Sequence, residues 1–424
     1  MNDTASPASR AAAHAPVAAP DDAARHAPMR FGEFVAMVAA LMALNALAID
    51  VMLPALQDIG AALGVADPND RQAILPVYLL GFAIGQFLIG SVSDRFGRRA
   101  VLIAGLLFYV AAALLCTLAP TFEALLLGRF VQGLASAAPR VVTISIVRDC
   151  YGGRRMASVL SLAMMFFLVV PVIAPAIGQA IVLVAPWRAI FGLLALYGLG
   201  MLLWTATRLP ETLAPERRRS VGPRALAAAF REVFATRQTL GYALAGGTMF
   251  GAMFGFIVSA EQIFAELYGL GALFPLAFAA MALSMSLSSL INSRLVGRLG
   301  MRRLSHGAVA TFTAISLALL ALELAGALTL APLMILLGGV MFLVGMIFSN
   351  FNALALEPMG HIAGTASSVF GSVTTLMAAL MGGAIGQAYD GTVLPLVAGY
   401  VVLGLTTLAI LLVTEKGRLF ERGA

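Results

Sequence analysis

Charged residues are scarce in this sequence. They make up 11% of the 424 residues, while hydrophobic residues make up 60%. A soluble domain carries about 25% charged residues, so the composition indicates a polytopic membrane protein and excludes an ordinary soluble one. The formal net charge of +6 would suit a nucleic-acid-binding protein. However, the basic residues lie in short clusters between apolar segments, and we therefore predict no nucleic-acid partner.

Lysine and histidine are also rare. Lys416 is the only lysine and is followed by Gly417, so the chain has no Walker A motif, which excludes ATP-driven pumping within it. No two histidines have the His-Glu-x-x-His spacing of a zinc enzyme. The four histidines are His14, His26, His306 and His361. We therefore predict neither an enzyme nor a bound metal or cofactor.

Long apolar segments dominate the chain after residue 30. Residues 1–30 contain no apolar run, which predicts a disordered cytoplasmic tail, and the first apolar segment is too long for a signal peptide. A helix of about 20 residues crosses a bilayer core of about 30 Å. The sequence predicts twelve such helices, at residues 34–56, 73–92, 100–119, 122–147, 157–184, 189–207, 239–260, 273–293, 305–325, 331–353, 364–388 and 393–413.

A polar, Arg-rich segment at 208–238 separates six predicted helices from six. The predicted domains are therefore an all-α bundle at 31–207, a cytoplasmic linker at 208–238, a second bundle at 239–415 and a short tail at 416–424. With the N-terminus inside, 23 of the 27 basic residues fall in inner segments. The positive-inside rule then predicts a multi-pass protein of the inner membrane with both termini cytoplasmic.

A short repeat relates the two halves. "DRFGRR" at 94–99 follows the second predicted helix, and "GRLGMRR" at 297–303 follows the eighth. Their alignment matches Gly97 to Gly300 and Arg99 to Arg302. Six helices plus six with such a match predict two duplicated, pseudo-symmetric bundles.

The segment "GSVSDRFGRR" at 90–99 is the strongest motif of the chain. Glycine lets two helices approach closely, and an aspartate beside a basic turn can form ion pairs that lock neighbouring helices. The alternative is an ordinary positive-inside loop, which the preceding Gly-x-x-x-Asp argues against. The predicted gating residues are Gly90, Asp94, Arg95, Gly97, Arg98 and Arg99.

With this motif the sequence resembles the major facilitator superfamily, and most closely its bicyclomycin/chloramphenicol-resistance (Bcr/CflA) branch of drug:proton antiporters. Matching segments are "AIDVMLPAL", "LLGFAIGQFLIGSVSDRFGRR", "GRFVQG", "WRAIF", "LPETL" and "DGTVLPL". The resemblance covers about residues 31–415. It implies two six-helix bundles that rock around a central cavity, proton-driven efflux, and an inner lock in which Asp149 pairs with Arg98. The alternative for Asp149 is a solvated charge at a helix end.

The predicted fourth helix carries a polar stripe. Its members are spaced 3, 4, 4 and 3 residues apart, which places them on one face of a helix. They are Arg129, Gln132, Ser136, Arg140 and Thr143. Two arginines inside a membrane span must face water or an acidic partner, unless they extend to the lipid headgroups. Arg129 matches the family's arginine in proton coupling, and we predict this role for Arg129 and Arg140.

Apart from Glu123, which is the second residue of the predicted helix at 122–147, Asp50 is the only acid inside a predicted helix of the first half. A carboxylate at such depth costs about 2.5–3.5 kcal/mol on insertion scales. Burial disfavours its charged form and a nearby arginine favours it, so the group could bind and release a proton. Asp50 also matches the family's acidic position. The alternative is a purely structural ion pair with Arg129 or Arg140.

Two further sets of residues are weaker candidates. "PVIAPAIGQ" at 171–179 resembles the family's antiporter motif at Pro171, Pro175 and Gly178, although Ala174 and Gln179 replace expected glycines. The alternative is a kinked helix without directional meaning. Predicted substrate-cavity residues, which could equally be packing or lipid-facing, are Gln132, Ser136, Met164, Phe167, Phe250, Met253 and Phe254. The acids Glu261, Glu266 and Glu323 fall near outer helix ends, where we expect solvated side chains.

The sequence favours a proton-coupled exporter of small amphipathic compounds that works by alternating access. The alternatives are a proton symporter that imports a metabolite and, more distantly, an intramembrane enzyme. The expected partners are the lipid bilayer, protons and a small-molecule substrate, with the protein functional as a monomer.

Overall fold

A computed structural model describes residues 29–214, 216 and 223–420, except for the side chains of 166–168 and 223–227. The described residues form helices and no β-strand. Most of the predicted tail at 1–30, the Arg217–Arg219 cluster and the Phe167 side chain lie outside the described part. The helices of the first half are α1 (Phe31–Asp50), η2 (Leu53–Ala55), α2 (Leu56–Ala62), η3 (Asp70–Ala73), α3 (Ile74–Phe96), α4 (Arg98–Leu118), α5 (Phe122–Cys150), α6 (Gly153–Val184) and α7 (Arg188–Arg208).

The second half repeats this pattern after a helix in the linker. It contains α8 (Pro223–Ala235), α9 (Arg237–Glu261), η5 (Gln262–Leu267), η6 (Gly271–Leu273), α10 (Phe274–Leu299), α11 (Met301–Leu324), α12 (Leu330–Leu356), η7 (Glu357–Ile362), α13 (Ala363–Gln387) and α14 (Leu394–Thr414). Helix α8 was not predicted. It is an amphipathic surface helix without an apolar run, which a search for membrane spans passes over.

Within the described residues, the helices long and apolar enough to cross a membrane number twelve once one broken stretch is divided. The described residues contain eleven continuous helical stretches of this kind, and one of them, Leu330–Gln387, is 58 residues long. A non-helical conformation at Met359 divides this stretch into α12 and α13. The predicted twelve-helix, all-α membrane fold is therefore confirmed.

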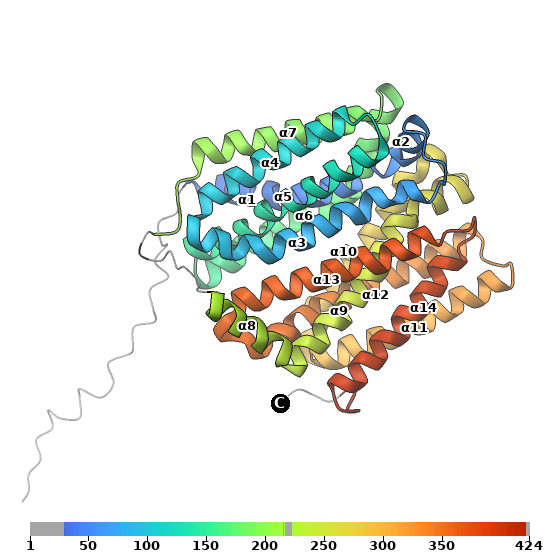
Figure 1. Cartoon of the computed structure of the whole chain (residues 1–424). Helices are drawn as coiled ribbons and strands as arrows, with labels where there is room; N and C mark the ends of the chain where they lie inside the picture. The colour runs from blue at the N-terminus through green and yellow to red at the C-terminus, as the bar shows by residue number, and fades with distance from the viewer. Residues whose placement is uncertain (1–28, 215, 217–222, 421–424) are drawn as a thin grey trace, which may run out of the picture.

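The two halves form two layers of helices (Figure 1). In the first half, α5 packs between α3 and α4, α1 packs on α6, and α7 packs on α4. In the second half, α12 packs between α10 and α11, and α9 packs on α13 and α14. The corresponding helices thus make corresponding contacts, which is the two-bundle pseudo-symmetry predicted from the short repeat. Across the halves, α3 packs on α13 and α6 packs on α10.

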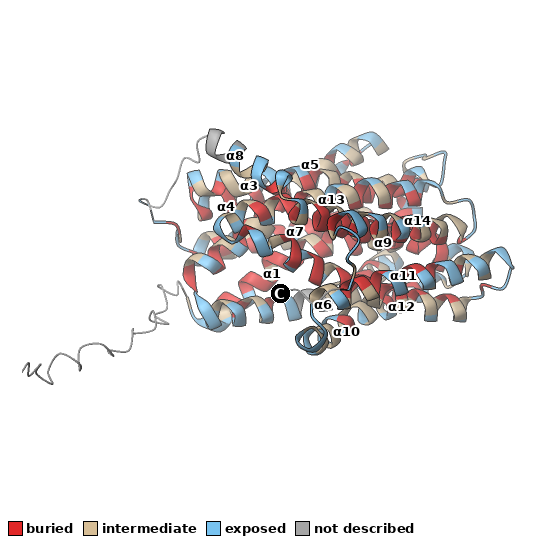
Figure 2. Cartoon of the chain, turned by 90° about the horizontal axis from the view of Figure 1, so that it is seen from below, coloured by how far each residue is buried: buried red, intermediate tan, exposed pale blue. Residues whose placement is uncertain are grey.

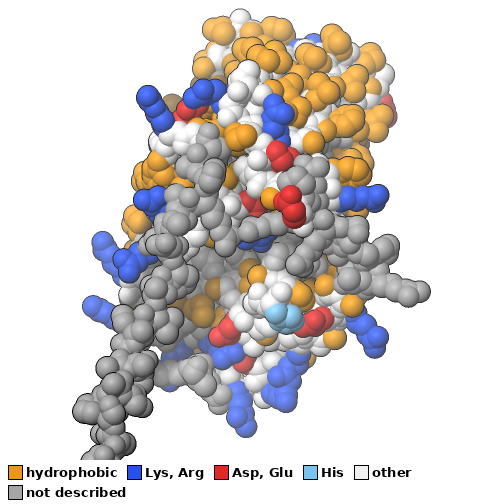
Figure 3. All heavy atoms as spheres, turned by 90° about the vertical axis from the view of Figure 1, so that its left-hand side faces the viewer, with side chains coloured by type: hydrophobic (Ala, Val, Ile, Leu, Met, Phe, Trp, Pro, Cys, Tyr) orange, Lys and Arg blue, Asp and Glu red, His pale blue; other side chains and the backbone are white. Residues whose placement is uncertain are grey.

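The outer faces of the helices are apolar. Leu118, Val184, Ile335 and Val413 are each more than 70% exposed. Buried residues concentrate on the faces that helices turn toward one another, and exposed residues lie outside them (Figure 2). A surface with so many exposed large apolar side chains suits a lipid environment. Figure 3 views the left-hand side of Figure 1, and there Lys and Arg side chains are spread around the end of the molecule.

Candidate functional site: a buried acid, an arginine stripe and a charged helix turn

Asp50 lies at a break in the first membrane helix. Helix α1 ends at Asp50, and the chain continues through a short turn and η2 before α2 begins at Leu56. Pro54 in η2 has no backbone N–H to continue an α-helix. Asp50 is 4% exposed, and among the described residues no ion pair joins it to an arginine. The structure therefore does not contain the ion pair with Arg129 or Arg140 that was the alternative interpretation.

Arg129 of α5 is held by neutral groups beside this break. Its side chain is fully buried, which excludes an extension to the lipid headgroups in this conformation. Its guanidinium donates to the Ala48 carbonyl at 3.1 Å and to Oε1 of Gln132 at 2.6 Å. The same group lies over the Tyr78 ring, 4.2 Å from its centroid, a cation–π contact. Through its bond to the Ala48 carbonyl, Arg129 thus contacts the backbone of α1 two residues before Asp50.

The polar stripe of α5 faces the interior of the first half. Gln132, Ser136 and Thr143 are fully buried, like Arg129, and Arg140 is half-buried. Asn45 of α1 joins this stripe to α3, because its Oδ1 accepts from Tyr78 Oη at 2.9 Å and from Ser136 Oγ at 3.5 Å. The sequence analysis did not select Asn45. Its signal was available, since it is the only side-chain amide in the first apolar segment.

Gly178 of the partial antiporter motif packs against the same break. A Cβ at Gly178 would overlap the Val51 carbonyl oxygen and would lie 3.3 Å from Cδ of Pro54. Pro171 and Pro175 both lie within the continuous helix α6. The glycine therefore lets α6 approach the backbone that immediately follows Asp50.

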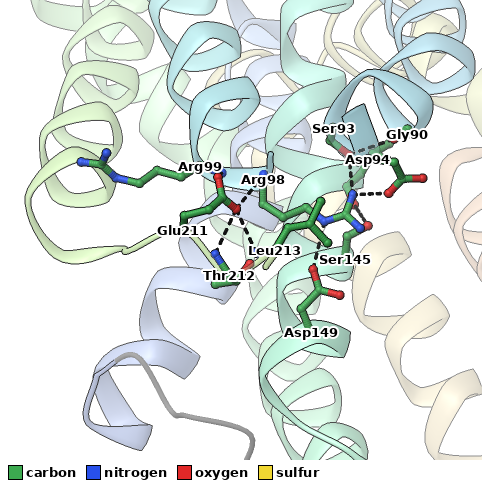
Figure 4. A network of polar contacts seen from close by, with 11 residues as sticks. Gly90, Ser93, Asp94, Arg98, Arg99, Ser145, Asp149, Glu211, Thr212 and Leu213 are labelled. Atoms are coloured by element: carbon green, nitrogen blue, oxygen red, sulfur yellow. Dashed lines mark hydrogen bonds and ion pairs between the residues drawn. The ribbon is translucent and has the colours of Figure 1, made fainter. Parts of the chain in front are cut away.

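The predicted gating residues gather around Arg98 at the turn between α3 and α4 (Figure 4). Arg98 is 4% exposed and contacts Asp94 Oδ1 at 2.5 Å and Asp149 Oδ2 of α5 at 3.0 Å. It also donates to Ser93 Oγ at 2.7 Å, and this hydroxyl donates to the Gly90 carbonyl at 2.9 Å. The expected contact of Asp149 with Arg98 is thus present, and it ties α3 and α4 to α5.

Glu211 completes this cluster from the segment after α7. Its carboxylate accepts from the backbone N–H of Arg98 at 2.9 Å and of Arg99 at 3.2 Å (Figure 4). These N–H groups belong to the first turn of α4, where they have no partner within the helix and the helix dipole favours an anion. "LPETL" contributed to the family resemblance, but the sequence did not reveal that its glutamate caps α4. The contact joins residues 112 positions apart or more.

The turn itself requires glycine. Gly97 has φ 96° and ψ 154°, and its counterpart Gly300 has φ 81° and ψ 154°. Residues with a side chain rarely adopt a positive φ of this kind. The same backbone turn thus recurs at the two positions that the sequence repeat aligned. The remaining motif residue, Arg95, lies over the Phe96 ring at 5.2 Å.

One expectation about the outer acids is wrong. Glu261 is not solvated: it is the last residue of α9, is 2% exposed, and pairs with Arg71 of the first half at 3.4 Å. Arg71, which falls between the predicted helices at 34–56 and 73–92, lies in η3 and is 9% exposed. Glu266 also pairs with Arg71, and Glu323 accepts from the backbone N–H of Val393 at 3.2 Å. The sequence could not show the two ion pairs of Arg71, because Glu261 and Glu266 lie 190 residues or more from it.

The predicted cavity residues have mixed environments. Gln132 and Ser136 belong to the buried stripe described above. Met164 is 37% exposed, while Phe254 is 1% exposed within the core of the second half. Phe250 packs on Phe348 with ring centroids 5.2 Å apart, and Met253 is half-buried. Their contact with substrate stays a prediction.

Comparisons with known proteins agree with this geometry. The model of the Major Facilitator Superfamily matches residues 38–383. The chain is 30% identical over 373 residues to a bicyclomycin resistance protein homolog of Haemophilus influenzae, covering 86% of this chain and 91% of that one. It is 38% identical over 173 residues to the multidrug resistance protein MdtL of Escherichia coli, covering 41% of this chain and 44% of MdtL.

Among solved structures, a D-xylose–proton symporter has a TM-score of 0.72 at 13% identity, covering 93% of this chain and 99% of that one. At this identity the likeness concerns the fold alone. The chain belongs to the Major Facilitator Superfamily, in the branch of the bicyclomycin- and multidrug-resistance transporters.

Proposed function

We propose that this protein exports small amphipathic compounds in exchange for protons, across the inner membrane, by alternating access. Membership of the family supports the general part of this proposal, which is that the protein is a membrane transporter of a small-molecule substrate. The names of the two resistance proteins support drug export as the direction. The concentration of arginine in the predicted inner loops supports an orientation with both termini in the cytoplasm.

The observation that carries the proposal is the environment of Asp50. A buried carboxyl group without an ion-pair partner among the described residues has a desolvation cost that its protonated form largely avoids. We therefore assign the protonated form to this conformation. Ionised Asp50 would need either water or Arg129, whose present acceptors are Gln132 and the carbonyls of Ala48 and Ile74.

Proton release from Asp50 would then change the contacts of α1 at its break. The new negative charge attracts the Arg129 guanidinium away from its neutral acceptors, and it stabilises any conformation that admits water to the site. This links the protonation state to the relative position of the two bundles, 31–207 and 239–415. Gly178 places α6 against the same backbone, so a shift at the break reaches α6, which packs on α10 of the other half.

The cluster around Arg98 is proposed as an inner lock for this cycle. Gly90 faces the other half, because a Cβ there would lie 3.3 Å from Ser368 Oγ of α13. The ion pairs of Arg98 with Asp94 and Asp149 lie on the helix turn just beyond this contact. The lock would hold α3, α4 and α5 as one unit while α3 moves along α13. We further propose that a single chain is the functional unit.

The test is transport by Asp50→Asn in inverted membrane vesicles. An imposed pH gradient drives uptake of compounds from a panel that includes bicyclomycin. The variant keeps the size and polarity of the side chain but cannot exchange a proton near neutral pH. We expect gradient-driven uptake to fall to the level of vesicles without the protein, while downhill exchange continues.

Asp58→Asn is the matched control, since Asp58 is an exposed acid eight residues further on in α2. It should transport like the wild type. Unchanged gradient-driven uptake by a stable Asp50→Asn protein would refute the role of Asp50. Loss of both kinds of flux with an unstable protein would instead indicate a structural role. Uptake that requires the opposite gradient would favour the symporter.

A further inference from the structure

A second charged cluster joins the two halves at the opposite end of the molecule from Arg98. Arg71 of η3 pairs with Glu261 at the end of α9 and with Glu266 of η5. Seven ion pairs are found among the described residues, and these two are the ones that connect the first half with the second. The side chains of Arg71 and Glu261 are 11% and 3% exposed, so this pair is largely removed from water, whereas Glu266 is 30% exposed.

Hydrogen bonds between the same segments extend this contact. Gln57 Nε2 of α2 donates to Glu266 Oε1 at 2.6 Å. Asn69 Nδ2 donates to the carbonyls of Gln387 at 3.1 Å and Tyr389 at 2.7 Å, and Gln387 Nε2 donates back to the Asn69 carbonyl at 2.7 Å. The Gln262 amide donates to Asn69 Oδ1 at 2.9 Å. Each bond joins residues more than 190 positions apart, from different halves.

The helices beside the cluster are shaped for close contact. Gly383 of α13 faces Pro76 of α3, and a Cβ there would lie 3.1 Å from it. Gly386, one turn further on, packs tightly on Val258 of α9, and a Cβ there would lie 3.9 Å from the buried Gln72. Gly383 thus lets α13 approach α3 at the end where the polar cluster lies, and Gly386 lets α13 approach α9. The two halves are therefore in tight contact here.

From this arrangement we propose that Arg71, Glu261 and Glu266 form the outer gate of the transport cycle. In the present conformation the gate is closed and holds the halves together on the outer side. The gate contains one arginine and two carboxylates, so its attraction depends on a single cation placed between two anions. When the halves separate, all three groups become hydrated, which offsets part of the lost attraction and keeps the closed state reversible.

This inference rests on the proposed alternating access, but it can be tested without transport. Spin labels at Ala61→Cys in α2 and Ala272→Cys in η6 report the distance between the halves at the outer end, since both positions are exposed. Cys116→Ala and Cys150→Ala provide a background without the native thiols. Distance distributions are measured by pulsed electron spin resonance without substrate or pH gradient.

We expect Glu261→Gln to populate longer distances at the outer end. A rise of about tenfold in the ratio of open to closed protein would correspond to about 1.4 kcal/mol. Arg71→Glu should shift the distribution further, because three carboxylates would then meet. The double variant Arg71→Glu/Glu261→Arg restores one cation between two anions and should return the distribution toward the short distance.

Arg208→Gln is the matched control. Arg208 pairs with Glu33 at 2.8 Å, but both residues belong to the first half and lie at its other end, so the outer distance should not change. Glu266→Gln, at a side chain 30% exposed, is a milder variant in case the others fail to fold. Unchanged distances in the folded gate variants, or an opening that the charge exchange does not reverse, would overturn the proposal. Failed proton-driven export with the expected distances would overturn only the proposed function.

Discussion

The two carboxylates of the Arg98 cluster should contribute very differently to stability. Asp94 Oδ1 lies closer to Arg98 than Asp149 Oδ2 does, at 2.5 against 3.0 Å. However, the Asp94 side chain is 40% exposed and that of Asp149 only 18%, with Arg98 at 4%. Exposed ion pairs contribute about 0–1 kcal/mol because water screens them, whereas removing one partner of a buried pair costs about 3–5 kcal/mol. Burial should therefore outweigh the shorter distance.

Double-mutant cycles measure this difference directly. The variants are Asp94→Asn, Asp149→Asn and Arg98→Gln with both doubles, and unfolding free energies are taken from reversible unfolding in mixed detergent micelles. We expect a coupling energy of about 2 kcal/mol between Arg98 and Asp149, and of less than about 1 kcal/mol between Arg98 and Asp94. Equal couplings, or a larger one for Asp94, would refute the argument from burial.

A transport assay distinguishes the proposed role of Asp94 in the lock from its small contribution to stability. Asp94→Asn should impair transport while substrate binding stays measurable, because the proposed lock acts on movement of the halves rather than on the binding site. Transport at the wild-type rate across the pH range would contradict this role.

Two further predictions concern packing and topology. Gly178→Ala should lower the unfolding free energy by about 1–3 kcal/mol and slow transport, because the new methyl group overlaps the Val51 carbonyl. Gly192→Ala in α7 is the control: it has open space around it and should be neutral or slightly stabilising. An equal effect at both positions, measured by unfolding in micelles, would argue against tight packing at the break. Ala235→Cys in the linker should resist a membrane-impermeant maleimide in intact cells while Ala272→Cys reacts, and the reverse pattern would invert the proposed orientation.

The helical architecture was predictable from sequence because a bilayer imposes a simple rule. Each crossing needs about 20 apolar residues with all backbone groups paired internally, and this leaves a strong pattern in the chain. The predicted helix at 122–147 is α5, Phe122–Cys150, and the one at 393–413 is α14, Leu394–Thr414. The break after Asp50 was missed, because Leu53 and Ala55 beside Pro54 continue the apolar run without a polar residue.

The candidate site was only partly predictable. The spacing of the α5 stripe placed Arg129, Gln132, Ser136 and Thr143 on one buried face, since a helix has a fixed rotation per residue. The spacing of residues along α5 does not show which groups of other helices they contact. It therefore could not reveal that Arg129 is held by the Ala48 carbonyl.

The sequence by itself determined the membrane class, the number of spans, the two-fold repeat and the motif around Arg98. These features are local, and they follow from hydropathy, helical spacing and backbone conformation at Gly97 and Gly300. The tertiary structure alone decided which charges meet: Glu211 on the first turn of α4, and Arg71 between Glu261 and Glu266. Such contacts join segments more than 100 residues apart, and their energy depends on burial. Burial arises only when the helices have packed, so no pattern along the chain records it.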